Sequence, residues 1–324
     1  MAEAPSVAVI GAGPAGLMAA EALLAAGHRV DVFDAMPSVG RKFLLAGRGG
    51  LNLTHSESRE PFLARYAARR EALAPIVGAF GPAELREWAQ RLGIPTFIGS
   101  SGRVFPSDLK AAPLLRAWLH RLREAGVAFH MRHRWLGWAG DGAHTLRFAA
   151  PRGEVRVDAD AVVFALGGAS WARLGSDGAW VPLLSARGVE VAPLLPSNCG
   201  FEVGRVDADG ALMPGWSEFF RTRFAGEPMK NVALSMRAAN GVVFDQPGEF
   251  VVTEGGVEGS LVYALSGPAR DTVAADGRAL VHIDLLPGRT AEFVRDEVAR
   301  PRGARSLSTH LKSRLGLDGV KTAL

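Results

Sequence analysis

A short apolar run near the start of the chain leads directly into three closely spaced glycines. Val7 to Ile10 suit a buried parallel strand, and an Ala/Leu-rich run typical of a helix follows the glycines. Strand, tight turn and helix in this order form the first half of a dinucleotide-binding βαβ unit, in which the helix N-terminus faces a pyrophosphate. We therefore expect the pyrophosphate to be held by Gly11, Ala12, Gly13, Pro14, Ala15 and Gly16.

A second apolar strand, Arg29 to Phe33, ends at Asp34, and Ala35 follows. An acid at this distance from the glycines is typical of a carboxylate that binds a ribose 2′-hydroxyl and disfavours a 2′-phosphate. We assign Asp34 and Ala35 to the nucleotide site. The alternative is a secretory or membrane segment, since residues 4–20 carry no charge, but Glu21 and the lack of a basic region before the apolar run argue against it.

The composition is that of a soluble globular protein of about two domains. The 32 arginines and five lysines are scattered along the chain, so we expect no nucleic-acid partner. A single cysteine, Cys199, excludes internal disulfides and fits a reducing cytoplasm. No apolar run is long enough for a membrane span. We expect a cytoplasmic protein without a metal, whose oligomeric state is not readable from the sequence.

A glycine-rich, cationic segment runs from Gly40 to His55. It has too little periodicity for a regular element, so we expect a ligand-wrapping loop with a short helix at its start. The cations Arg41, Lys42 and Arg48 suit a diphosphate, although a solvated cationic patch is the open alternative.

The middle of the chain alternates helices and strands. We expect helices within residues 59–93 and 110–126, and strands at 96–98, 103–105 and within 127–147. In an extended segment, Trp135 and Trp138 would lie on opposite faces, as would His130 and His133, which argues against a metal pair.

The strand expected at 161–166 runs into Gly167 and Gly168, and a Gly-Ser-Asp-Gly turn precedes a helical run that ends at Gly188. In an open parallel sheet, ligands bind at the carboxyl ends of the strands. Ala165, Gly167 and Gly168 are therefore expected to line the same nucleotide site, unless this is an ordinary glycine turn. Residues 1–188 would form the dinucleotide-binding domain.

From residue 189 the pattern changes to short β-like runs, at 232–237, 241–245 and 249–253, with a helix at 259–274. Two further helices are expected after residue 290. We expect residues 189–324 to form a β-rich substrate domain followed by helices. The fold class is thus α/β, a Rossmann-like domain with a parallel central sheet plus an inserted β-rich domain.

Read in order, residues 7–34, the loop at 40–54, the FALGG strand, PSNCGF (196–201) and TEGGVEGSLVYALSGPARD (253–271) resemble the BaiN-like flavoproteins. This resemblance implies an NAD(P)/FAD-dependent oxidoreductase whose glutathione-reductase-like FAD domain is interrupted by a β-rich substrate domain. It also implies FAD contacts: the pyrophosphate at the three glycines, the adenosine ribose at Asp34, the phosphate and ribityl side at Arg41 and Lys42, the flavin near Asn52, and the nucleotide along Gly167 and Gly168.

The chain departs from this family in two places. Many relatives carry G-G-R-C-N where this chain has Arg48-Gly-Gly-Leu-Asn52. The family also closes with a glycine-rich A-G-E…G-G-Y segment over the flavin, and this sequence ends before it. The resemblance thus implies a fragment or a fold with an incomplete flavin site, in which affinity comes mostly from the ADP half of FAD.

The function expected from these features is that of an FAD-dependent oxidoreductase, in which bound flavin passes hydride from a reductant to a small unsaturated or carbonyl substrate. NAD(P)H is one candidate reductant. An NAD-dependent dehydrogenase and a non-catalytic dinucleotide-binding protein remain as alternatives. No nucleophile elbow or P-loop indicates hydrolysis, and no catalytic acid or base stands out.

Overall fold

The computed structural model describes residues 4–46, 50–142, 144–206 and 212–324. The chain divides into two compact units, the first formed by residues 1–194 and the second by residues 195–324. Arg48, one of the three cations expected near the ligand, lies outside the described residues.

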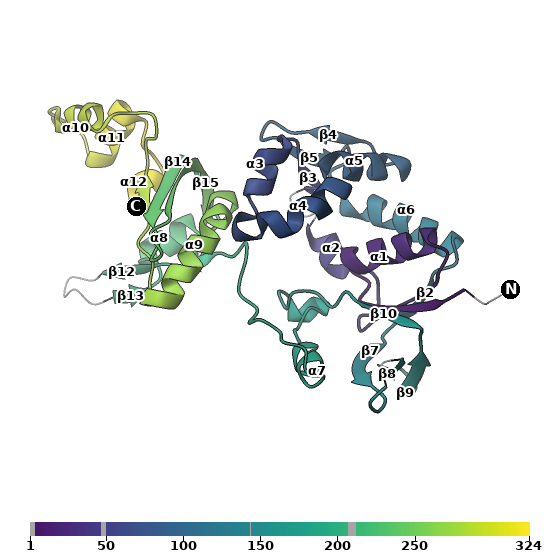
Figure 1. The fold of residues 1–324 in the computed structure, drawn as a ribbon. Helices are drawn as coiled ribbons and strands as arrows, with labels where there is room; N and C mark the ends of the chain where they lie inside the picture. Colours follow the sequence, from purple (N-terminus) through teal and green to yellow (C-terminus); the bar gives the residue numbers. More distant parts are fainter. Residues whose placement is uncertain (1–3, 47–49, 143, 207–211) are drawn as a thin grey trace. The chain divides into compact units, whose positions relative to one another are not determined.

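The first unit alternates strands and helices over its whole length (Figure 1). In chain order its elements are β1 (Ser6–Ile10), α1 (Pro14–Ala25), β2 (Arg29–Asp34), α2 (Arg41–Ala46), β3 (Thr54–His55), α3 (Arg59–Ala64), the 3-10 helix η1 (Ala67–Arg69), α4 (Arg70–Ala79), α5 (Pro82–Arg91), β4 (Thr96–Ile98), β5 (Arg103–Pro106), α6 (Ala111–Glu124), β6 (Ala128–Met131), β7 (Arg134–Trp138), β8 (Thr145–Ala150), β9 (Gly153–Asp158), β10 (Ala161–Phe164), the 3-10 helix η2 (Ala172–Leu174) and α7 (Val181–Ser185).

A parallel sheet in the order β10-β1-β2-β6 forms the centre of this unit. Helices α1, α2 and α6 lie on one side of it, and the antiparallel sheet β7-β8-β9 lies on the other (Figure 1). The α/β class with a parallel Rossmann-like sheet is confirmed. Because β1 has a partner on each edge and a layer on each face, its apolar run is buried throughout.

Side chains alternate between the two faces of the sheet, as the strand period of two requires. Val9 and Val32 pack in the core under the helices. Ile10 and Phe33 pack on the other face, against residues such as Phe148 of the antiparallel sheet. The two buried layers fix the strand register, so the carboxyl ends of β1, β2 and β10 meet at one edge.

Two expectations about side-chain direction were wrong. The rings of Trp135 and Trp138 lie 4.9 Å apart, centre to centre, because a β-bulge before Gly137 shifts the register and returns both to one face. The rings of His130 and His133 lie 5.7 Å apart, since β6 ends at Met131 and the chain turns before His133.

The second unit combines antiparallel strands with helices. Its elements are β11 (Phe201–Glu202), β12 (Gly204–Val206), β13 (Leu212–Pro214), α8 (Glu218–Phe224), β14 (Pro228–Arg237), β15 (Val243–Val252), β16 (Gly256–Glu258), α9 (Ser260–Asp276), β17 (His282–Asp284), α10 (Ala291–Ala299), α11 (Leu307–Leu315) and α12 (Val320–Ala323).

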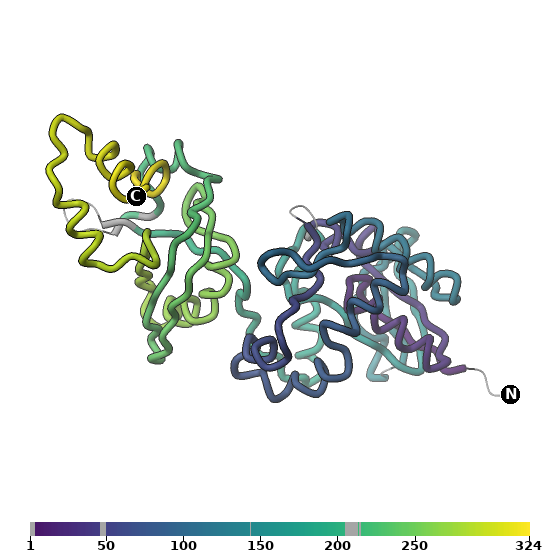
Figure 2. The backbone as a smooth tube through the Cα atoms, turned by 90° about the horizontal axis from the view of Figure 1, so that it is seen from above, coloured from purple at the N-terminus to yellow at the C-terminus, as the bar shows by residue number. Residues whose placement is uncertain are grey.

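A sheet in the order β11-β16-β15-β14-β17 forms the core of this unit together with α9. The expected runs at 241–245 and 249–253 are parts of one strand, β15, which passes through Pro247. At Pro247 the strand is paired with β14 alone, so the missing N–H is tolerated there. Figure 2 shows the yellow C-terminal segment beside the green strands of this unit, and Lys321 on α12 donates to the carbonyl of Asn231 on β14.

Among the described residues, no helix is long and apolar enough to cross a membrane.

Candidate functional site

The glycine turn between β1 and α1 is held by close backbone contacts. A Cβ atom on Gly11, which has a φ of +112°, would lie 2.2 Å from the carbonyl oxygen of Ala165 on the neighbouring chain segment. A Cβ on Gly16 would lie 1.8 Å from the carbonyl oxygen of Gly11. A Cβ on Gly13 would meet no protein atom within 4 Å. Gly11 and Gly16 are thus required by packing, whereas Gly13 borders open space.

Asp34 fastens this turn to the end of β2. One carboxylate oxygen accepts a hydrogen bond from the amide of Ala12 at 2.7 Å, and the other accepts from the amide of Met36 at 2.7 Å. The half-buried carboxylate is therefore a structural tie across the carboxyl edge of the sheet. Each of its oxygens keeps a further lone pair for a ligand hydroxyl.

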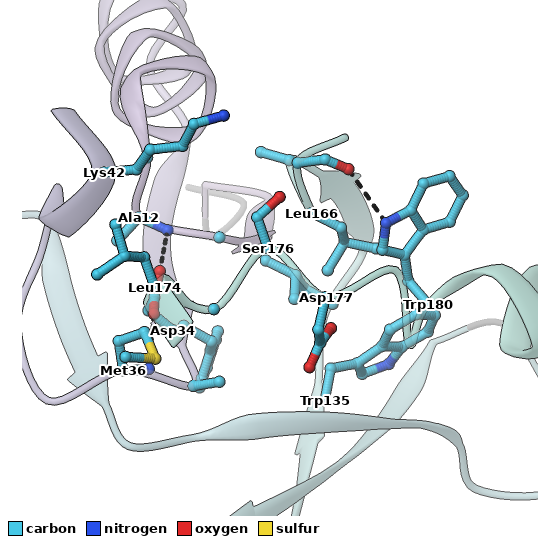
Figure 3. Close-up of a pocket in the computed structure, with 18 of the residues that line it drawn as sticks. Ala12, Asp34, Met36, Lys42, Trp135, Leu166, Leu174, Ser176, Asp177 and Trp180 are labelled. Atoms are coloured by element: carbon cyan, nitrogen blue, oxygen red, sulfur yellow. Dashed lines mark hydrogen bonds between the residues drawn. The ribbon is translucent and has the colours of Figure 1, made fainter. Parts of the chain in front are cut away.

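A cavity of about 580 Å³ opens at this edge, within the size range of small-molecule and cofactor sites. Figure 3 shows Ala12, Asp34 and Lys42 on one side of it and Trp180 and Leu166 on the other. Its lining comes from the ends of β1, β2 and β10, from α2, and from the segments around β7, η2 and α7.

Most of the residues assigned to the nucleotide from sequence line this cavity, namely Gly11, Ala12, Gly13, Pro14, Ala15, Asp34, Ala35, Arg41, Lys42, Ala165 and Gly167. Gly16 lies beneath the turn instead. Gly168 and Asn52 are exposed and do not line the cavity. On either side of Asn52, the backbone amides of Leu51 and Leu53 donate hydrogen bonds to carbonyls within residues 104–109. That these residues contact a cofactor stays a prediction.

Several lining residues were missed from sequence. The cavity also contains Arg134, Trp135, Ser176, Asp177 and Trp180. Residues 134–135 lie on a strand of the second layer, whereas Ser176 and Asp177 belong to the Gly-Ser-Asp-Gly turn (175–178) and Trp180 follows it. No spacing in the sequence relates these two segments to the glycine turn between β1 and α1. The Gly-Ser-Asp-Gly turn was the one sequence signal that pointed to any of these residues.

Arg134 and Asp177 form an ion pair in the lining of the cavity. A guanidinium nitrogen of Arg134 lies 2.9 Å from a carboxylate oxygen of Asp177, and the other oxygen accepts from the amide of Ala179. Burial works to raise the pKa of Asp177, but the bonds from Ala179 and Arg134 outweigh it and leave the pKa below its ordinary value. Asp177 therefore carries its charge at neutral pH.

Three lining residues bury a polar atom that has no hydrogen-bond partner among the described residues. These atoms are the Nε of Arg41, the indole nitrogen of Trp135 and the hydroxyl of Ser176. Buried polar groups in folded proteins are nearly always bonded. All three residues line the cavity, where unpartnered polar atoms fit a polar ligand, and the cations Arg41 and Lys42 fit the diphosphate of FAD.

The described residues contain no group of three or more His, Cys, Asp or Glu side chains placed to hold a metal ion.

Comparison with known proteins places the whole chain in one family. Residues 5–265 match the family model described as the HI0933-like protein Rossmann domain, and residues 210–324 match the HI0933-like protein barrel and H2TH domain. The chain is 25% identical over 319 residues to the 3-dehydro-bile acid delta(4,6)-reductase of Clostridium scindens. This match covers 94% of this chain and 68% of that protein.

The solved structures that match the chain are more distant in sequence. THI4 of Thermovibrio ammonificans is 17% identical with a TM-score of 0.38, over 68% of this chain and 71% of that one. The open conformation of a flavocytochrome c3 fumarate reductase is 15% identical with a TM-score of 0.41, over 71% of this chain and 47% of that one.

Proposed function

Because the chain belongs to the HI0933-like family of flavin-dependent oxidoreductases, as its resemblance to the BaiN-like proteins indicated, we propose that it binds FAD in the cavity of its first unit and reduces a small organic molecule. The observation that carries this proposal is the open space at Gly13. A backbone without a side chain at the N-terminus of α1 is what a diphosphate requires there.

Different lining residues would bind different parts of the cofactor. The turn at Gly13 and the first amides of α1 would bind the diphosphate, and Arg41 and Lys42 would offset its charge. Asp34 would accept a hydrogen bond from the adenosine ribose with the lone pairs that Ala12 and Met36 leave free. FAD, when bound, supplies the hydride transfer itself.

We further infer an unsaturated or carbonyl compound as the substrate and NAD(P)H as the reductant. The first inference draws on the reductase of Clostridium scindens, whose name specifies a dehydro bile acid. The second rests on the BaiN-like resemblance alone. The cavity itself is lined by apolar wall residues such as Trp180, Leu183 and Leu184 beside the polar turn, which suits a cofactor with both characters.

An anaerobic reduction experiment tests this function. The protein is loaded with FAD, NADH or NADPH is added, and the loss of the flavin absorption band is followed, then its return when a conjugated enone is supplied. Bleaching and enone-dependent recovery are expected. If FAD binds but neither nucleotide reduces it faster than it reduces free FAD, the chain is a binding protein. If NAD binds and FAD does not, the chain is an NAD-dependent dehydrogenase.

A further inference from the structure

We propose that Ser176 is a direct contact of the bound dinucleotide and that its hydroxyl donates a hydrogen bond to a phosphate oxygen. This inference rests on the proposed function and assigns a new residue to the same site. Ser176 follows Gly175 in the turn after η2 and lines the cavity.

The backbone of Ser176 is fixed by its own turn. Its amide donates to the carbonyl of Trp171 at 3.2 Å, and its carbonyl accepts from the amide of Trp171 at 3.1 Å. Gly175, with a φ of +92°, allows the close approach of Met36, whose Cγ lies 2.7 Å from where a Cβ would stand. The turn therefore presents the side chain of Ser176 to the cavity without using its hydroxyl.

That hydroxyl is buried and unused. Ser176 is only 9% exposed, and its Oγ has no hydrogen-bond partner among the described residues. A buried hydroxyl without a partner destabilises a fold, so its retention points to a partner outside the chain. Gly167 makes room for it, because a Cβ on Gly167 would lie 2.7 Å from the Ser176 Oγ.

The surroundings indicate that the partner is anionic. Gly13 at the N-terminus of the twelve-residue helix α1 lines the same cavity, as do Arg41 and Lys42. In Figure 3 the Ser176 hydroxyl and the Asp177 carboxylate point in different directions, with Asp177 turned toward Trp135. The side chain has staggered rotamers, so rotation about the Cα–Cβ bond can turn the hydroxyl without backbone movement. A phosphate oxygen would then accept a charge-assisted bond.

The test compares Ser176→Ala with Ser185→Ala, which alters an exposed serine of α7. Isothermal titration with ADP and with adenosine separates the phosphate contact from contacts to the base and sugar. Ser176→Ala should weaken ADP by about tenfold or more, as expected for a lost bond to a charged group, and leave adenosine unchanged. The control should bind both ligands as the parent does.

Thermal unfolding without ligand distinguishes a ligand contact from a structural role. If the hydroxyl waits for a ligand, the melting temperature of unliganded Ser176→Ala should equal or exceed that of the parent, while the rise produced by ADP should shrink. A lower melting temperature with unchanged ADP affinity would make Ser176 a structural residue and overturn the inference.

Two other outcomes also count against it. Equal losses for ADP and adenosine would place the hydroxyl on the sugar or base rather than on the phosphate. Should the parent protein bind neither ADP nor FAD, the proposed function fails together with the inference, whereas normal binding by the parent and by Ser176→Ala overturns the inference alone.

Discussion

Replacing Asp34 with Ala should destabilise the first unit as well as weaken the cofactor. The carboxylate accepts the amides of Ala12 and Met36 at 2.7 Å each, so both bonds are lost. A hydrogen bond to a charged group contributes about 1.5–3 kcal/mol. Because Asp34 is only half-buried and water can reach the edge of the cavity, we take the lower value, which gives about 3 kcal/mol for two bonds.

Asp34→Asn provides an internal comparison, because its amide keeps one acceptor oxygen and presents a donor to the second amide. It should cost roughly half as much as Asp34→Ala. Urea unfolding without nucleotide, followed by tryptophan fluorescence, measures both, since six of the seven tryptophans lie in the first unit and only Trp216 lies in the second. Asp141→Ala, at an exposed position in the same unit, is the control.

The urea midpoint should be lowest for Asp34→Ala, higher for Asp34→Asn, and highest for the control and the parent, which should agree. The Ala variant should also bind FAD more weakly by roughly 1–3 kcal/mol. An Asp34→Ala protein that unfolds at the parent's urea concentration would refute the tie between the glycine turn and β2. Unchanged FAD affinity would remove the ribose contact.

Three further outcomes follow from the same cavity. Gly13→Val should abolish FAD and ADP binding in a titration yet leave the urea midpoint nearly unchanged, because its Cβ meets no protein atom within 4 Å; retained binding would remove the diphosphate from this turn. Gly16→Ala should destabilise the unit by about 1–3 kcal/mol in the same unfolding assay, since its Cβ would overlap the Gly11 carbonyl; a parental midpoint would show that the turn can relax. Asp177 has a folded-state pKa below its unfolded value, so its contribution to stability is present above the unfolded pKa and is lost as the pH falls through the folded pKa. Asp177→Asn should flatten the acid side of the stability profile measured by thermal unfolding, and an identical acid slope would show that the bonds from Arg134 and Ala179 do not stabilise the fold.

Local patterns predicted most of the first unit. The apolar run before Gly11 and the acid at the end of β2 indicated a parallel sheet edge with a nucleotide site, and the elements are found where the pattern placed them. These features are readable because each depends on residues close together in sequence: a strand buried on both faces, a turn without side chains, and a helix that starts at Pro14.

What sequence reasoning missed depends on irregular backbone or on contacts between distant segments. The bulge before Gly137 brought Trp135 and Trp138 together, and no local signal marked it. Asn52, assigned from a resemblance, does not line the cavity, and its contact with a cofactor stays a prediction. Ser176 was overlooked because two features that the sequence does not display single it out. Gly167, nine positions earlier, leaves room for its hydroxyl, and that hydroxyl has no partner among the described residues.

Isothermal titration of the 324-residue chain with FAD, followed by displacement with ADP, tests whether the cavity at the glycine turn holds a dinucleotide. Binding of FAD at the glycine turn predicts saturation at one FAD per chain and full competition by ADP, because both place a diphosphate at the N-terminus of α1. An FAD signal that does not saturate, or FAD binding that ADP cannot displace, would contradict a dinucleotide site in this cavity.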